Sequence, residues 1–495
     1  MLIDSPAGNW QGDRLNSLRR SGRHPNRLET GVRAEMPDIR LIVGLVASII
    51  AFADPVAPAA MGPATDAFRR LYDAPQMMYK DGVPHLDRDG SVRVAYDPRR
   101  SFLPLGLYHG LNYLDSLEPD NGRLLAPFGE FRKAGFTYVH TNKPLSKGYL
   151  DRLHRFGLRM VKSEARPEDA QRFAAHPAML GWDVFDEPDS DGNFAQYPAR
   201  FEAFGKFRDG IRAHDPVRPI FVNTVAWIHA GHGNRAWWVK WHQAGDLSCH
   251  DNYPIVHAQT PTETLTDPQW GQSIPETVAL AVEAASGKKP VWAILQAYGQ
   301  LPGNRWRFPS PAELRCMAYA AVVHGATGLC WFSLDVDDVR RNATGWGISP
   351  DPLPTYNSEG TGYVADEARL ADIRNLWSAV AETNHEIEAL QEFLFAPTPA
   401  VKYRVYVRGD SPSETPVRTL LKRSGARWLL IAVNLDNATI GLRVRFPTRM
   451  RITGARPVFG EREGLTSGHD WLEDELGPFE VRVYELASTG AAAER

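Results

Sequence analysis

Residues 176–188, with the sequence HPAMLGWDVFDEP, indicate a buried β-strand that ends in acidic side chains. Asp183, Asp186 and Glu187 lie among leucine, tryptophan, valine and phenylalanine, and a proline follows directly. Burying a carboxylate is costly unless it is paired or used. Parallel α/β proteins keep their chemistry at the carboxyl ends of their strands. The stretch therefore predicts a parallel strand that leads into a site, and the alternative is an acidic turn after an ordinary strand.

The chain around this stretch alternates short apolar strands with helix-like segments, from about residue 100 to 335. Residues 201–214 carry phenylalanines at helical spacing, and 311–325 open with a capping box of Ser310 and Glu313. Eight βα units predict a (β/α)8 TIM barrel. A doubly wound sheet is the competing fold, but its first strand should lead into a glycine-rich phosphate loop, and here it leads into LYHGLN. The eight predicted strands are 102–109, 137–142, 159–164, 180–187, 219–224, 246–252, 290–296 and 328–335.

Polar side chains stand at or just past the end of all eight predicted strands. Because parallel strands bring their carboxyl ends to one rim of a barrel, these side chains should converge on a concave site rich in hydrogen-bonding groups. The opposite strand ends show no comparable polar set. The predicted rim residues are His109, Asn142, Glu164, Asp186, Glu187, Asn223, Thr224, Asp251, Asn252, Gln296 and Asp335.

The predicted barrel spans residues 61–392 and includes short N-terminal strands. Its long loop at about 336–367 is interpreted as a wall or lid of the site, and a helix at 368–390 closes the barrel. Alternating strands over 393–487 predict an antiparallel β-sandwich. Residues 488–495 are rich in alanine, serine and glycine, which is typical of a disordered tail.

Residues 1–60 are interpreted as an N-terminal extension with a secretory signal segment. The apolar run at 41–53 is 13 residues long, too short for an ordinary membrane span. Arg40 precedes it and small residues follow, which predicts a signal peptide at about 36–53 or 36–59 and a start at Met36. We therefore expect a secreted or periplasmic protein without stable membrane insertion. An uncleaved anchor is the alternative.

Composition argues against two classes of protein. The net charge is −3 and no stripe of lysine and arginine is interleaved with aromatic residues, so a nucleic-acid partner is not expected. The three cysteines, Cys249, Cys316 and Cys330, give no disulfide framework, and Cys249 and Cys330, each inside a predicted strand, are interpreted as buried apolar residues. The chain has neither a CxxC nor an HExxH motif, so we expect no zinc site and no cofactor.

With this barrel and rim, residues 176–188 resemble the fourth-strand motif of clan-A-type glycoside hydrolases, which ends in Asn-Glu-Pro or Asp-Glu-Pro. The resemblance covers roughly residues 90–490, including the C-terminal sandwich that many of these enzymes carry. Residues 251–254 and 291–296, and Trp331, also match such barrels. The motif is specific for the superfamily and not for the substrate. The resemblance implies a glycosidase with a carbohydrate partner.

The resemblance also implies that Glu187 is the general acid/base. A glycosidic oxygen is a poor leaving group, so a carboxylic acid has to protonate it near neutral pH. The charge of Asp186 and the apolar strand around it are expected to favour the protonated form of Glu187.

The chain departs from the family at Gln296, where retaining enzymes place a nucleophilic glutamate at the end of strand seven. Three explanations remain open. Another carboxylate completes the pair, with Asp251 favoured and Asp335 in reserve. Alternatively, the substrate supplies its own nucleophile, as in enzymes that cleave 2-acetamido sugars, and Asp186 orients the acetamido group while Glu187 protonates. Thirdly, the barrel binds carbohydrate without cleaving it.

A metal-dependent hydrolase on the same rim is the rival from another enzyme class, with His109, Asp251 and Asp335 as ligands. In the glycosidase interpretation, side chains that donate and accept at once suit sugar hydroxyls. Each of them has an alternative structural role, such as capping a helix. Trp331 is either a stacking platform or barrel core, the tryptophans at 237, 238 and 241 are core or a sugar subsite, and Glu164 is a partner for a nearby ion pair. The expected substrate-binding residues are His109, Asn142, Asn223, Tyr253, Gln296, Trp331 and Asp335.

Overall fold

The computed structural model describes residues 85–87, 92–93, 101–108, 125–190, 192–226, 234–258, 262–266, 273–286, 289–300, 303–334, 345–350, 367–409, 416–461 and 463–489. The predicted signal segment, most of the predicted 336–367 loop, His109 and Asp335 lie outside these residues, as does the tail from residue 490. Within the described ranges, no helix has the length and apolar character needed to cross a membrane.

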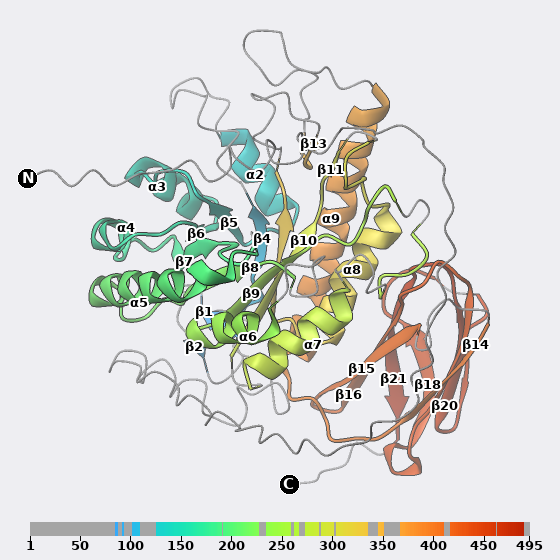
Figure 1. The fold of residues 1–495 in the computed structure, drawn as a ribbon. Helices are drawn as coiled ribbons and strands as arrows, with labels where there is room; N and C mark the ends of the chain where they lie inside the picture. The colour runs from blue at the N-terminus through green and yellow to red at the C-terminus, as the bar shows by residue number, and fades with distance from the viewer. Residues whose placement is uncertain are drawn as a thin grey trace, which may run out of the picture. The chain divides into compact units, whose positions relative to one another are not determined.

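Eight parallel strands close into a barrel in the order β4-β5-β6-β7-β8-β9-β10-β12 (Figure 1). Each strand overlaps one of the eight segments predicted from sequence, so the predicted TIM barrel is confirmed. Their bounds are β4 Leu105–Tyr108, β5 Tyr138–Thr141, β6 Arg159–Lys162, β7 Met179–Asp186, β8 Ile220–Thr224, β9 Ser248–Asn252, β10 Val291–Gln296 and β12 Gly328–Phe332.

Helices cover the outside of the barrel (Figure 1). The predicted capping box at the start of α8 is present, with Ser310 Oγ accepting from Glu313 N at 3.2 Å and a Glu313 carboxylate oxygen accepting from Ser310 N at 2.7 Å. The helices are α2 Leu125–Lys133, α3 Lys147–Arg155, α4 Pro167–Phe173, α5 Tyr197–His214, α6 Arg235–Ala244, α7 Ile274–Ala284, α8 Pro311–Val323 and α9 Glu367–Phe395, with a 3-10 turn, η4, at Phe194–Gln196.

Short strands accompany the barrel at two places. β1 His85–Asp87 pairs with β2 Val92–Arg93 and with β3 Ser101–Phe102, just before the first barrel strand. β11 Gly299–Gln300 pairs with β13 Gly345–Trp346 beyond the end of β10.

The barrel has two apolar layers because side chains alternate along each strand. Val161, Leu180, Phe221 and Ile294 belong to the inner layer, which the strands enclose. The outer layer lies between strands and helices and is the larger of the two. Which layer a residue joins therefore depends on its place in the strand.

The C-terminal region forms two four-stranded antiparallel sheets, in the orders β14-β17-β20-β19 and β15-β16-β21-β18. Leu430, Leu442, Leu472 and Tyr484 are buried between them, so the predicted β-sandwich is confirmed. In Figure 1 this domain lies beside α8 and α9. The strands are β14 Arg404–Arg408, β15 Val417–Ser424, β16 Arg427–Asn434, β17 Ile440–Arg445, β18 Ile452–Pro457, β19 Thr466–Gly468, β20 Trp471–Leu476 and β21 Val481–Ser488.

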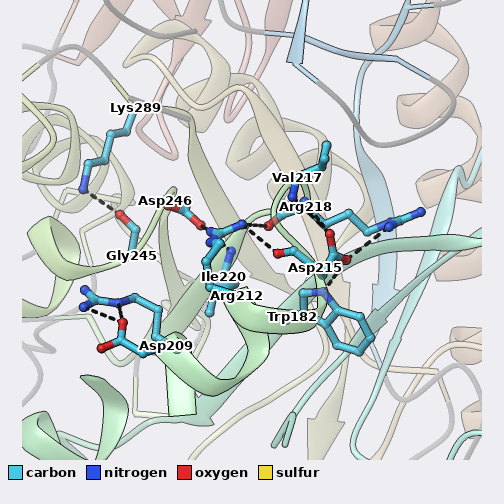
Figure 2. Close-up of polar contacts among 11 residues, drawn as sticks. Trp182, Asp209, Arg212, Asp215, Val217, Arg218, Ile220, Gly245, Asp246 and Lys289 are labelled. Atoms are coloured by element: carbon cyan, nitrogen blue, oxygen red, sulfur yellow. Dashed lines mark hydrogen bonds and ion pairs between the residues drawn. The ribbon is translucent and has the colours of Figure 1, made fainter. Parts of the chain in front are cut away.

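Charged residues also gather at the amino ends of β8 and β9, contrary to the expectation that these strand ends lack a polar set. Figure 2 shows Arg212 in an ion pair with Asp246, whose Oδ2 also accepts from Ile220 N at 2.8 Å. Asp215 accepts from Trp182 Nε1 at 2.9 Å and pairs with Arg218 at 3.1 Å. Each acid here has a basic partner, so this face of the barrel reads as a structural network.

Candidate active site

A β-bulge determines which side chains at the end of β7 face the barrel interior. Between Asp183 and Asp186 the strand advances three residues, while its partner β8 advances two, from Phe221 to Asn223. The two residues in between both pack on the outer apolar layer. The extra residue therefore restores the inward direction for Asp186, because a bulge re-aims the side chains that follow it.

Glu187 follows the bulge in an unusual backbone conformation. Its φ is 47°, in the left-handed region that non-glycine residues rarely adopt. Such a conformation costs about 1–3 kcal/mol and is found often at active sites. Glu187 N donates to Asn223 O at 2.8 Å, which holds the turn in place. The turn brings the Glu187 carboxyl next to those of Asp186 and Asp251.

Asp251 and Glu187 form a carboxyl–carboxyl pair. Asp251 lies near the end of β9, is 4% exposed, and hydrogen-bonds the side chain of Glu187. Burial raises the pKa of Asp251 well above its usual range, and the charge and hydrogen bond of Glu187 raise it further. Two carboxyls in contact resist double ionisation, so this dyad shares a proton. The structure thus brings together the two residues that we expected to form the catalytic pair.

Asp186 is a third carboxyl in the same cluster. Burial and then the charges of Glu187 and Asp183 raise the pKa of Asp186 to about 8. Asn223 Nδ2 donates to Asp186 Oδ1 at 2.9 Å and Tyr108 also hydrogen-bonds this carboxyl, which limits the rise. At neutral pH Asp186 is therefore largely protonated, and the cluster as a whole carries fewer negative charges than its sequence suggests.

Below this cluster, the floor of the barrel contains a fully buried acid, Asp183. It accepts from Ser163 Oγ at 3.0 Å and from Asn223 N at 3.3 Å, and lies 3.1 Å from His140 Nε2. Burial lowers the pKa of His140 to about 3 and raises the pKa of Asp183. Burial thus disfavours the charged form of both groups, and their hydrogen bonds support the rim from below.

An aromatic wall stands beside the dyad. The rings of Tyr253 and Tyr298 are 5.5 Å apart and nearly perpendicular, and Tyr298 contacts Phe332 at 5.1 Å and Trp306 at 5.5 Å. Burial and then the charges of Asp251 and Glu187 raise the pKa values of both tyrosines. The wall is therefore within electrostatic reach of the carboxyls, and it presents apolar rings of the kind on which sugars stack.

Trp331, one of the two candidates for that stacking role, lies elsewhere. It is fully buried in the outer apolar layer, and its Nε1 donates to Asn384 Oδ1 of α9 at 2.9 Å. Its position in β12 turns it away from the interior, so the platform interpretation is wrong and the core interpretation is right. Trp238 and Trp241 are each 1% exposed and are core residues too.

Gln296 ends β10, the seventh strand of the barrel, where retaining enzymes have their nucleophile, but its amide is fully engaged in contacts within the protein. Its Oε1 accepts from Ile255 N at 2.9 Å, and its Nε2 donates to the carbonyls of Ile255, Tyr298 and Arg307 at 3.0, 3.2 and 2.9 Å. With no exposed surface, the amide ties two loops together instead of binding a sugar hydroxyl. The expected binding role of Gln296 is therefore wrong.

The remaining predicted rim residues divide between the site and its surroundings. Asn142 is half-buried just past β5, and its Oδ1 has no hydrogen-bond partner among the residues that the structure describes. Asn223, 2% exposed, serves Asp186 and accepts from Cys249 Sγ at 3.7 Å. Thr224 bonds His242 of α6 at 2.8 Å, Asn252 donates to Ser273 O at 3.4 Å, and Glu164 is exposed to solvent. Thr224 and Asn252 therefore serve contacts outside the carboxyl cluster.

Sequence reasoning missed His140, Tyr108, Tyr298 and Trp306. His140 and Tyr108 lie inside predicted strands, whose residues we took for apolar core. The alternation of side chains along each strand, which turns both residues inward, is the signal that could have identified them. The other two follow β10, and only the folded loop brings them to the carboxyls.

No protein-family model matches the chain, and the search of curated proteins finds no match to its sequence. Solved structures with similar folds include a catalytic mutant of a GH42 β-galactosidase from G. stearothermophilus, at 11% identity and a TM-score of 0.48, covering 78% of this chain and 98% of that one.

Two other similar structures are a glycoside hydrolase family 5 protein from Bacteroides vulgatus and an α-amylase from H. orenii. The first has 13% identity and a TM-score of 0.47, and the match covers 83% of this chain and 96% of that one. The second has 11% identity and a TM-score of 0.45, and the match covers 78% of this chain and 99% of that one. All three are below 0.5 in TM-score, so the function of this chain has to be argued from its own site.

Proposed function

We propose that this protein is a glycoside hydrolase that cleaves a poly- or oligosaccharide, with Glu187 as general acid/base and Asp251 as nucleophile. The observation that carries the proposal is the hydrogen bond between these two carboxyls at the carboxyl-terminal rim of a closed barrel. Glycosidases need one protonated and one ionised carboxyl on either side of the scissile bond. A dyad that shares one proton supplies that combination.

The contact between the two carboxyls favours retention of configuration. Inverting enzymes keep their carboxyls about 6.5–9.5 Å apart so that a water fits between them, whereas retaining pairs are closer, at about 5–5.5 Å. Two carboxyls in contact lie nearer to the retaining separation than to the inverting one. Asp251 is therefore assigned the role of nucleophile rather than that of a base which activates water.

The reaction then follows in two steps. The reacting form is the one in which the shared proton is on Glu187 and Asp251 is ionised. Glu187 then donates this proton to the glycosidic oxygen while the Asp251 carboxylate attacks the anomeric carbon, so the bond to the leaving group breaks and a glycosyl ester forms. In the second step Glu187 takes a proton from water, whose oxygen attacks the same carbon and releases Asp251. Asp186, protonated at neutral pH, adds no second negative charge beside the nucleophile.

The surroundings fit a carbohydrate. The half-buried ring of Trp306, which contacts Tyr253, offers an apolar surface for a pyranose, and the hydroxyls of Tyr253 and Tyr298 lie near the carboxyls. Asn142 Oδ1, buried without a hydrogen-bond partner, is an acceptor for a sugar hydroxyl. A small number of polar groups beside aromatic rings is typical of ligand sites.

The test compares the purified full chain with Glu187→Gln and Asp251→Asn on a panel of polysaccharides and aryl glycosides. Each change keeps the shape of the side chain and removes its proton chemistry, so we expect losses of about 10²–10⁴-fold or more in kcat. Glu164→Gln is the matched control, because Glu164 also follows a strand with a left-handed φ, of 52°, but is exposed and outside the cluster. This control is expected to keep full activity.

Other outcomes identify the alternatives. If Asp251→Asn still cleaves 2-acetamido sugars while Asp186→Asn does not, the nucleophile is the substrate's own acetamido group. If the protein binds a glycan but cleaves none, with or without the changes, the barrel is a binding protein. Loss of activity on chelation would indicate a metal-dependent enzyme. In the favoured mechanism, proton NMR shows the first product with the configuration of the substrate.

A further inference from the structure

In the connection between β10 and α8, hydrogen bonds join residue 300 to the described residues that follow Gly303, and we call this segment the hairpin. Gln300 N donates to Trp306 O at 2.8 Å, and Trp306 N donates back to Gln300 Oε1 at 3.3 Å. Gly303 stands between them with a φ of 95°, a conformation that glycine adopts freely. The hairpin therefore has a defined shape without any ligand.

Anchors on both sides hold this hairpin against the barrel. His257 N donates to Arg305 O at 2.9 Å, and Gln296 Nε2 holds Arg307 O at 2.9 Å. The Arg307 guanidinium pairs with Glu313 of α8 at 2.6 Å. Gln296 thus replaces the strand-seven glutamate with a group that positions a loop, and the loop presents Arg305 in a fixed place.

The guanidinium of Arg305 differs from those of Arg307 and Arg315, the next two arginines near the rim, in its lack of a carboxylate partner among the described residues. It stacks over the Trp306 ring at 5.3 Å, and the structure gives its side chain neither an ion pair nor a hydrogen bond within the described ranges. By contrast, Arg307 pairs with Glu313, and Arg315 pairs with Glu386 at 2.8 Å. Burial lowers the pKa of Arg305, which reflects the loss of solvent around the charge.

Arg305 lies one aromatic layer from the carboxyl dyad. Trp306, on which it stacks, contacts Tyr253 at 6.2 Å and Tyr298 at 5.5 Å. The pKa of Tyr298 responds both to the positive charge of Arg305 and to the negative charges of Asp251 and Glu187. A ligand that reaches the dyad along this wall therefore meets an unpaired cation.

We propose that Arg305 binds an anionic substituent on the sugar beside the scissile bond, either the carboxylate of a uronic acid or a sulfate ester. This inference rests on the proposed glycosidase function. A guanidinium presents a planar fork of donors that matches both groups. A partly desolvated charge without a partner is costly, and an anionic sugar offsets this cost where a neutral one does not. Pre-organisation of the hairpin reduces the entropy lost on binding.

The experiment compares neutral, uronate-containing and sulfated oligosaccharides as substrates of the full chain, its Arg305→Gln variant and its Arg305→Lys variant. For the anionic class that is cleaved, Arg305→Gln should lower kcat/KM by about 10- to 100-fold, mainly through KM, since one charge-assisted contact is lost. Arg305→Lys should restore part of this loss. The two anionic arms separate a carboxylate ligand from a sulfate.

Two controls separate binding from folding. Arg423 stacks on Trp428 at 5.1 Å in the sandwich, so Arg423→Gln removes a similar arginine–tryptophan contact far from the dyad and should leave kcat/KM unchanged. Calorimetric titration of the Glu187→Gln variant with the same oligosaccharides should show affinity that falls with added salt, and this dependence should weaken when Arg305→Gln is combined with it.

The possible outcomes of these experiments support or refute the anionic subsite as follows. If neutral glycans are cleaved best and Arg305→Gln has no effect on KM, the anionic subsite is refuted while the glycosidase function stands. If no glycan in any class is cleaved or bound, the glycosidase function fails and the subsite fails with it. A preference for one anionic class that disappears in Arg305→Gln supports the inference.

Discussion

Replacing Asp186 by asparagine should make the folded protein more stable at neutral pH, by an amount that grows as the pH rises. The pKa of Asp186 is about 8 in the folded state, whereas that of an unfolded aspartate is about 4. The folded state therefore keeps a proton that the unfolded state releases. Between about pH 4 and pH 8 this group favours unfolding progressively more, at up to about 1.4 kcal/mol per pH unit.

The magnitude follows from that slope. From pH 5 to pH 7 the wild type should lose up to about 2.7 kcal/mol from this group, and about half of that once its partial exposure and its coupling to Glu187 are taken into account. Asparagine keeps the oxygen that accepts from Asn223 and Tyr108, but it does not titrate. The stability of the Asp186→Asn variant relative to wild type should thus rise by about 1–3 kcal/mol over this range.

Urea denaturation followed by circular dichroism at pH 5, 6 and 7 measures this difference. Glu164→Gln serves as the control for the loss of one carboxyl, because its side chain is exposed. A stability difference between Asp186→Asn and wild type that is equal at pH 5 and pH 7 would refute the reasoning, since Asp186 would then titrate alike in both states. A difference that shrinks with rising pH would show the opposite shift.

Two further predictions concern Gln296 and Trp331, to which sequence analysis gave roles in substrate binding. Gln296→Glu restores the glutamate of retaining enzymes, yet it should lower stability by about 3–5 kcal/mol at pH 7 without raising kcat, because a buried carboxylate would face three carbonyl oxygens. Faster hydrolysis at unchanged stability would contradict this. Trp331→Phe should cost about 2–4 kcal/mol in urea denaturation, since Asn384 Oδ1 loses its donor and a cavity forms. Its KM should equal that of the wild type, and a raised KM would return Trp331 to the site.

The barrel was predictable because its signals are local. Each strand is a short apolar run, each helix has its own period, and the capping box of Ser310 and Glu313 needs only four residues. The expectation that Glu187 and Asp251 lie on the same rim followed from one further rule, that parallel strands bring their carboxyl ends to one edge. None of these predictions needs knowledge of which distant residues are in contact.

The direction of side chains was less predictable. Whether a side chain such as Trp331 in β12 or Asp186 in β7 faces inward depends on the register of its strand. In β7 the bulge shifts this register by one residue before Asp186. The bulge comes from the pairing of β7 with β8, which a pattern within β7 does not reveal. The polar network at the amino ends of the strands was missed for a similar reason, because Arg212 and Asp246 are 34 residues apart and meet only in the fold.

The sequence by itself determined the barrel, the sandwich and the acidic end of β7, because apolar period and strand ends are properties of neighbouring residues. Only the tertiary structure decided that Asp251 contacts Glu187, that Gln296 anchors a loop, and that Arg305 stacks on Trp306 without a carboxylate partner in the described part of the chain. Those outcomes depend on burial and on contacts between distant segments. The free energy of a buried amide or charge is set by whatever the fold places next to it.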